Sequence, residues 1–257
     1  MRARLRSFEA WLLPKGWLDV LRQIIVFCGA YYAYRYARGA VDSRAADAFA
    51  NSRDLIDIER ATHTFFEPAL QEWATHAGWI SDFASWMYVN SHFTITVVSL
   101  AWIYLFRNSS FYWVRNMFSI AMALAIILYI VFPAAPPRFF PEWGFIDSVA
   151  EFTGVPATDV TVNALFNPFA AVPSMHVAFA LMLGLPLARL VKPRWLKGIW
   201  LVYPEIVPFV VIATGNHFWL DAVLGALVAA LAAAGAQLML QLHPAWAFTP
   251  RRAEAAA

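Results

Sequence analysis

Two histidines and a carboxylate stand at the starts of two apolar segments about forty residues apart. The first segment opens with Pro-Ser-Met-His at residues 173–176, and the second with His-Phe-Trp-Leu-Asp at residues 217–221. The spacing of His217 and Asp221 is i, i+4, which places both side chains on one face of a helix. An imidazole that donates from one ring nitrogen to a carboxylate is fixed in tautomer and can attack through the other nitrogen. These residue types therefore suit phosphoryl transfer through a covalent phosphohistidine.

Three further side chains suit the binding and protonation of a transferring phosphate. His176 could protonate the leaving oxygen, because an imidazole titrates near neutrality. Arg138 offers a planar, bidentate donor for the equatorial phosphate oxygens. Ser174 and the backbone amides after it would add neutral donors at the positive end of a helix. This arrangement requires neither a metal nor a cofactor.

Each of these residues alone also has a purely structural interpretation. His176 could cap a helix, and His217 could donate to a loop carbonyl. Asp221 is harder to explain in this way, because an unpaired carboxylate in an apolar segment costs several kcal/mol in lipid. A metal hydrolase with His176, His217 and Asp221 as ligands is an alternative that needs an open coordination position. Sensitivity to chelators would distinguish it.

The composition predicts a polytopic membrane protein. Of the 257 residues, 61% are hydrophobic and 14% are charged, which lies well outside the range of soluble domains. Membrane spans and short connections consume nearly all of the chain, so we expect residues 1–257 to form one membrane domain. The net charge of +2 is too small to indicate a nucleic-acid partner.

Six segments are long and apolar enough to cross a bilayer, at roughly 20 residues per crossing. They lie near residues 17–37, 81–106, 114–133, 172–191, 196–213 and 217–241. We therefore predict an all-α fold, a helical bundle with six transmembrane helices.

Two of the remaining segments are predicted to lie at the membrane surface. The segment 43–78 is too charged to span, and in it Leu55 and Ile56 alternate with charged residues such as Arg53 and Glu59. This pattern predicts an interfacial amphipathic helix with one face in lipid and the other in water. The loop 134–170 is rich in proline, and we expect it to form a cap that contains some short helix.

Lysine and arginine are concentrated in alternate connections between the predicted spans. The basic positions are Arg2, Arg4, Arg6 and Lys15 before the first span, Arg107 and Arg115, Arg189, Lys192, Arg194 and Lys197, and Arg251 and Arg252 after the last. Positive residues near span ends stay on the cytoplasmic side. We expect a multi-pass plasma-membrane protein with cytoplasmic N- and C-termini. Arg138, His176, His217 and Asp221 then share the extracytoplasmic face.

These motifs resemble those of the type 2 phosphatidic acid phosphatase superfamily. The Pro-Ser-Met-His string is similar to its middle motif, the pair His217 and Asp221 to its last motif, and Ala-Pro-Pro-Arg at 135–138 to its first. The resemblance implies a helical catalytic core over residues 50–235, with a metal-free histidine mechanism. The Ala-Pro-Pro-Arg string and Gly-Asn-His-Phe at 215–218 look most like the branch of inositol phosphorylceramide synthases, inositolphosphotransferases that act on lipids.

The sequence also departs from the superfamily pattern. A lysine expected before the arginine of the first motif is absent, and Val210 and Val211 stand where a Ser-Arg pair is expected. Two phosphate-binding cations are therefore missing. Asn216, His92, Asn90 or an arginine of the segment 43–60 are the candidate substitutes, although His92 and Asn90 could equally serve helix packing.

The function predicted from the sequence is an integral membrane enzyme of lipid metabolism. His217, oriented by Asp221, takes a phosphate or phosphorylated headgroup from a membrane lipid donor and passes it to an alcohol acceptor such as inositol or a lipid hydroxyl. With water as acceptor, the same chemistry gives a lipid phosphate phosphatase. A non-catalytic lipid or anion transporter is a further alternative, for which polar residues at mid-span depth or related halves would speak.

Overall fold

The computed structural model describes residues 15–39, 44–155 and 169–242, and these ranges form an all-helical fold without a strand. The helices are α2 (Trp17–Gly39), α3 (Ala45–Ala61), α4 (Glu67–His76), α5 (Trp79–Asn90), α6 (Thr96–Phe106), α7 (Asn108–Val131), α8 (Ser148–Thr153), α10 (Met175–Leu190), α11 (Arg194–Ala213) and α12 (Trp219–Leu242). A π-helical turn at Ser91–Ile95 joins α5 to α6. The predicted all-α fold is confirmed for the described residues.

Helices occupy all six segments predicted to span the membrane, but six spans are not confirmed. By length and composition, three described helices qualify as spans, namely α7, α11 and α12. A fourth would be the pair α5 and α6, which is bent by 49° at its break. The helix α10 is apolar but has only 16 residues. In α2, charged residues such as Asp19 and Arg22 lower the hydropathy of a helix that is otherwise long enough.

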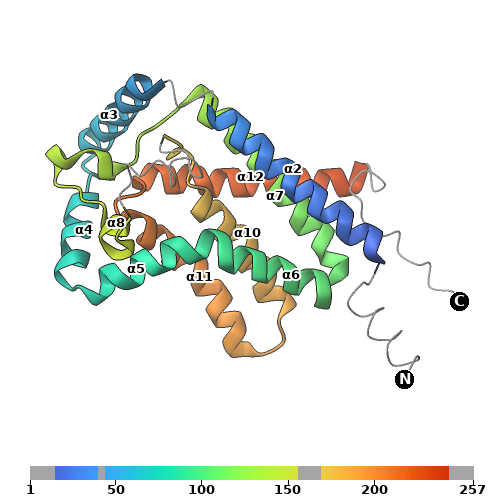
Figure 1. Cartoon of the computed structure of the whole chain (residues 1–257). Helices are drawn as coiled ribbons and strands as arrows, with labels where there is room; N and C mark the ends of the chain where they lie inside the picture. The colour runs from blue at the N-terminus through green and yellow to red at the C-terminus, as the bar shows by residue number, and fades with distance from the viewer. Residues whose placement is uncertain (1–14, 40–43, 156–168, 243–257) are drawn as a thin grey trace, which may run out of the picture.

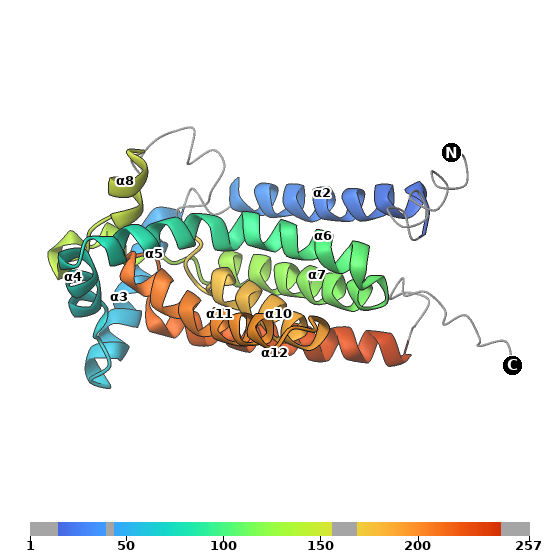
Figure 2. The same cartoon turned by 90° about the horizontal axis from the view of Figure 1, so that it is seen from below.

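The long helices pack side by side, and the short helices gather at one end of the bundle (Figures 1 and 2). The central helix α10 contacts α7, α11 and α12, and α7 also packs along α12. Phe118, Phe179 and Leu183 are buried between α7 and α10, where Ala232 of α12 completes the core. Figure 2 shows α3, α4 and α8 together at the left end, away from the start of α2 and the end of α12.

The segment predicted as one interfacial helix is two helices, and the predicted exposure of Glu59 was wrong. The chain turns between α3 and α4 at His63, whose φ of 58° is left-handed. Glu59 was placed on the wet face of the predicted helix, yet it is fully buried, whereas Ile58 is half exposed. The polar pattern of α3 does not reveal this burial, because the partners of Glu59 lie far along the chain.

The loop after α7 packs as a cap on the same end of the bundle. It begins with 3₁₀ turns at Pro137–Phe139 and Pro141–Trp143 and continues into α8. Phe140 and Phe145 of the loop are buried with Ile56 of α3 and Phe218 before α12. The predicted cap with short helix is thus present in residues 134–155, while the positions 156–168 lie outside the described residues.

Two basic turns lie at the end of α10 opposite the cap. Arg107, between α6 and α7, donates from Nε to the carbonyl oxygen of Leu190 at 3.2 Å. Asp19 at the start of α2 accepts hydrogen bonds from Tyr104 and Tyr112, which ties the start of α2 to this end. Of the connections predicted to be cytoplasmic, the two described turns, at Arg107 and after Leu190, therefore lie away from the histidine-bearing end.

Candidate active site

The end of α11 delivers His217 through a tight glycine turn. The backbone N–H of Asn216 donates to the carbonyl oxygen of Val211 at 3.1 Å, and the backbone N–H of Gly215 donates to the carbonyl oxygen of Ile212 at 2.9 Å. These two bonds form a Schellman motif, in which the residue after the cap is left-handed. Gly215 has φ of 67°, and a Cβ there would lie 2.8 Å from the carbonyl oxygen of Ile146. The turn therefore requires glycine for both its conformation and its close packing.

The first turn of α12 fixes the geometry of His217 and Asp221. One oxygen of Asp221, Oδ2, accepts from the backbone amide of Phe218 at 2.9 Å and lies 3.2 Å from Nδ1 of His217. The aspartate thus stabilises the helix start as the third residue of a capping box would. The same oxygen sets the imidazole tautomer, so that Nδ1 carries the proton and donates. In the described residues Nε2 of His217 has no hydrogen-bond partner, which leaves its lone pair available.

The start of α10 is held directly against this turn. The backbone amide of Ser174 donates to the carbonyl of Asp221 at 3.0 Å. A Cβ on Gly225 would overlap the carbonyl oxygen of Ser174, so the two backbones touch at this point. His176 consequently lies beside His217, with ring centroids 5.8 Å apart and planes inclined at 63°. The His176 ring also stacks on Tyr88 of α5, with centroids 4.3 Å apart.

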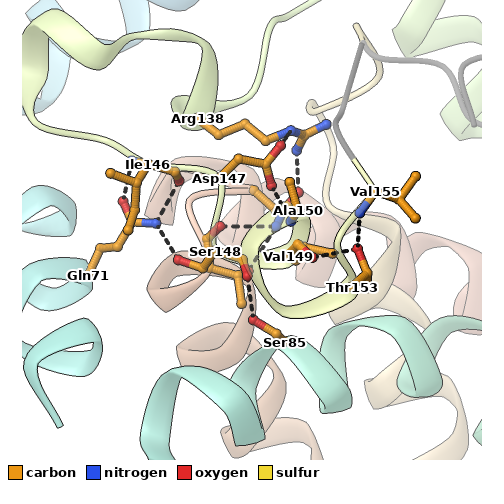
Figure 3. Close-up of polar contacts among 12 residues, drawn as sticks. Gln71, Ser85, Arg138, Ile146, Asp147, Ser148, Val149, Ala150, Thr153 and Val155 are labelled. Carbon is orange, nitrogen blue, oxygen red and sulfur yellow. Dashed lines mark hydrogen bonds and ion pairs between the residues drawn. The ribbon is translucent and has the colours of Figure 1, made fainter. Parts of the chain in front are cut away.

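Arg138 reaches the site from the loop after α7. Its backbone amide donates to the carbonyl of Gly215 at 2.8 Å, and its Nη1 donates to Oδ1 of Asn216. Its Nε lies 3.5 Å from Oδ2 of Asp147, the residue that caps α8. Figure 3 shows this ion pair above a second set of contacts, in which the side chain of Gln71 of α4 bonds to the backbone of Ile146, shortly before α8. The guanidinium is therefore tethered by two oxygens while only partly buried.

Two glutamates, one from α3 and one from α4, accept hydrogen bonds from backbone amides in the first turn of α12. Oε1 of Glu67 accepts from the Trp219 amide at 2.9 Å, and Oε1 of Glu59 accepts from the Leu220 amide at 3.4 Å. Both side chains are fully buried. Burial, followed by the charge of Glu67, raises the pKa of Glu59 to about 9. Burial also raises the pKa of Glu67.

Five of the eight predicted site residues lie together at the site. His217 contacts Asp221 and His176, and Arg138 contacts Asn216, the residue before His217. Ser174 lies among them, fully buried, with no hydrogen-bond partner for its hydroxyl in the described residues. Asn90 is turned to its own helix and donates to the carbonyl of Trp86 at 2.9 Å. The side chain of His92 lies outside the described residues.

The arginines of α3 and of the residue before it are engaged away from the histidines. Arg44 pairs with Asp47 at 2.8 Å, while Arg53 lies over the ring of Phe140 and Arg60 over that of Trp143. The valines at the position of the expected Ser-Arg pair, Val210 and Val211, are fully buried in α11. The candidate substitute that contacts the site arginine is therefore Asn216.

Sequence reasoning missed four residues around the site, namely Glu59, Glu67, Asp147 and Tyr88. The available signal for Glu67 was the apolar string of phenylalanines before it, in which an acid is costly to bury without a partner. Asp147 and Tyr88 carried no comparable signal, because each acts across a contact between distant segments. In the described ranges no group of three His, Cys, Asp or Glu side chains is placed to hold a metal.

The arrangement couples a carboxylate-oriented imidazole to a second imidazole and an arginine, which suits acid, base and nucleophilic roles around a phosphate. A sequence model described as the PAP2 superfamily matches residues 53–235. The chain belongs to the PAP2 superfamily. Comparison with curated proteins and with solved structures gives no significant match. PAP2 membership indicates phosphatase or phosphotransferase activity on lipid-like substrates, in keeping with the apolar helices of this chain.

Proposed function

We propose that this PAP2 protein is a lipid phosphotransferase in which His217 is the nucleophile. The observation that carries the proposal is the hydrogen bond between His217 Nδ1 and Asp221, which leaves Nε2 without a partner beside His176. An imidazole held in this way is oriented by its carboxylate and reactive through its second nitrogen. Arg138, tethered by Asn216 and Asp147, supplies the positive charge for the phosphate oxygens.

The first half-reaction transfers the phosphoryl group to the protein. The lone pair of His217 Nε2 attacks phosphorus, and the bond from phosphorus to the alkoxide of the lipid donor breaks. His176, protonated at this stage, gives its proton to the departing oxygen. The positive charge that develops on His217 is balanced by Asp221, which is fully buried and therefore interacts strongly with it.

The second half-reaction releases the phosphoryl group to an acceptor. His176, now neutral, removes the proton of an acceptor hydroxyl, and the resulting oxygen attacks phosphorus while the bond to Nε2 breaks. We assign the acceptor as an alcohol, inositol or a lipid hydroxyl, because the strings at 135–138 and 215–218 resemble those of inositolphosphotransferases. Water in the same position would make the protein a lipid phosphate phosphatase.

The proposed site lies at the end of the bundle that carries α3, α4 and α8. The basic turn at Arg107 contacts the opposite end of α10. Since basic connections stay in the cytoplasm, we place the site on the extracytoplasmic side of the plasma membrane. A lipid donor in the outer leaflet would then reach His217 from the interface.

The test is an assay of purified protein with radiolabelled phospholipids, with inositol and lipid alcohols offered as acceptors. The wild-type protein should form a phosphorylated acceptor without added divalent metal, and vanadate should inhibit it. His217→Ala should abolish turnover, whereas the exposed histidine in His76→Ala serves as the matched control and should not. Free phosphate as the main product would replace the transferase assignment with a phosphatase. Undiminished turnover in His217→Ala would overturn the nucleophile.

A further inference from the structure

Two carboxyl groups that the reaction steps above do not use meet behind the nucleophile. Glu59 at the end of α3 and Glu67 at the start of α4 are both fully buried, and the charge of Glu67 acts on Glu59. The first oxygen of each accepts a backbone amide of α12, that of Leu220 for Glu59 and that of Trp219 for Glu67. Helix starts leave such amides without intrahelical partners, so the pair satisfies two of them.

The second oxygen of each carboxyl group is buried and has no hydrogen-bond partner in the described part of the chain. A hydrogen bond between two carboxyl groups requires a proton on one of them, because two carboxylates have no donor and repel. The shorter amide bond belongs to Glu67, 2.9 Å against 3.4 Å, which favours the ionised form on Glu67 and the proton on Glu59.

We propose that Glu59 and Glu67 share one proton and act together as positioning residues that hold the first turn of α12, and with it His217, in its reactive place. This role rests on the proposed function of His217. The glutamates act close to the nucleophile, because the two amides that they bind lie between His217 and Asp221 in the chain. A change in the pair would move the helix start and alter the direction of His217 Nε2.

The shared proton also limits the negative charge beside the nucleophile. The charges that act on Glu59 come from Glu67 of α4 and Asp221 of α12. The neighbouring cation Arg60 lies over the ring of Trp143 rather than against the glutamates. With one proton in the pair, Asp221 can remain ionised for His217; without it, three carboxylates would crowd one helix start.

The pH dependence follows from the raised pKa of Glu59. Below about 9 the pair keeps its proton, and above this value it loses it. The protonated pair stabilises the folded state fully below the ordinary pKa of 4.5, and this contribution is lost as the pH rises through about 9. Loss of the proton should loosen the start of α12 and lower kcat on the alkaline side.

Glutamine provides the test, because its side-chain amide can donate a hydrogen bond but cannot ionise. In Glu59→Gln the amide replaces the protonated carboxyl and can donate to Glu67 at any pH. In the double variant Glu59→Gln with Glu67→Gln, each amide oxygen faces α12, so two NH₂ groups meet and cannot bond to each other. Asp57→Asn on α3 and Glu72→Gln on α4 change exposed acids of the same helices and are the matched controls.

We expect Glu59→Ala to lower kcat with little change in KM, and Glu59→Gln to restore most of the loss. The double variant should lose kcat by roughly 100-fold, the effect of a 1 Å misplacement of reacting groups. Wild-type kcat should fall above pH 9, and the fall should be absent in Glu59→Gln. Equal alkaline profiles for the wild type and Glu59→Gln would overturn the shared proton, even if the double variant does not fold.

His217→Ala assayed alongside separates the two proposals. An inactive His217→Ala together with a fully active double variant refutes the positioning role and leaves the nucleophile in place. An active His217→Ala refutes the proposed function, whatever the glutamate variants do.

Discussion

Replacing Gly225 by alanine should disable the site while leaving most of the bundle intact. Gly225 lies one turn after Asp221 on α12, where the backbone of Ser174 passes directly over it. An added Cβ would overlap the carbonyl oxygen of Ser174 and stand 3.1 Å from its carbonyl carbon, whereas ordinary contacts begin at 3.4 Å. Backbone atoms cannot rotate away as a side chain can, so α12 and the start of α10 must separate.

The expected magnitude follows from that separation. A shift of roughly 1 Å would stretch the bond from the Ser174 amide to the Asp221 carbonyl and move His176 from His217, and such a displacement costs about 100-fold in rate. Overpacking costs roughly 1–3 kcal/mol of stability, of which alanine recovers up to about 1 kcal/mol through its greater helix propensity. Catalysis should therefore suffer far more than folding.

The assay compares kcat of Gly225→Ala with that of Gly235→Ala on the same helix. A Cβ at Gly235 would meet the flexible end of Ile120 at 3.2 Å, which can move aside. Both variants should elute as folded protein in detergent and show the helical circular dichroism of the wild type. Wild-type kcat in Gly225→Ala would refute the claim that contact of these two backbones places His176 against His217.

Three other side chains give contrasting expectations. Ser174→Ala should lower kcat about tenfold but leave thermal stability unchanged or higher, because it removes a buried hydroxyl that has no partner; a marked loss of stability would contradict this. Asp147→Asn should strengthen inhibition by phosphate severalfold, since it removes the anion that competes for Arg138 and keeps the cap of α8; unchanged inhibition would argue against Arg138 as the phosphate ligand. Gln71→Ala should lower the melting temperature, because it removes hydrogen bonds to Ile146 worth about 1 kcal/mol each; an unchanged value would contradict that anchor.

The sequence predicted the helices well where the apolar runs were long. The predicted spans 196–213 and 217–241 differ from α11 and α12 by two residues or fewer at each end. The predicted spans at α2 and α10 do not qualify by length and composition, because α2 is too polar and α10 is too short. Apolar periodicity identifies a helix, but the neighbours of that helix decide how much of it faces lipid.

Part of the candidate site could also be predicted, because its strongest pair is local. The i, i+4 spacing predicted that His217 and Asp221 meet on one helix face. The structure joins them by a hydrogen bond, but His217 lies two residues before the start of α12. The positions of His176 and Arg138 followed from counting the spans between them, and both lie beside the turn that carries His217. The phosphate-binding role of Arg138 stays a prediction.

The sequence by itself determined the long apolar helices and their order, because helix formation depends on local composition and spacing. It also determined the pairing of His217 with Asp221, because four residues separate them and His217 lies just before the start of α12. Only the tertiary structure decided that Glu59 and Glu67 turn inward to the start of α12, and that Asp147 shares Arg138 with Asn216. The cost of burying such charged groups is met by partners from distant segments, and no local pattern specifies which segments will meet.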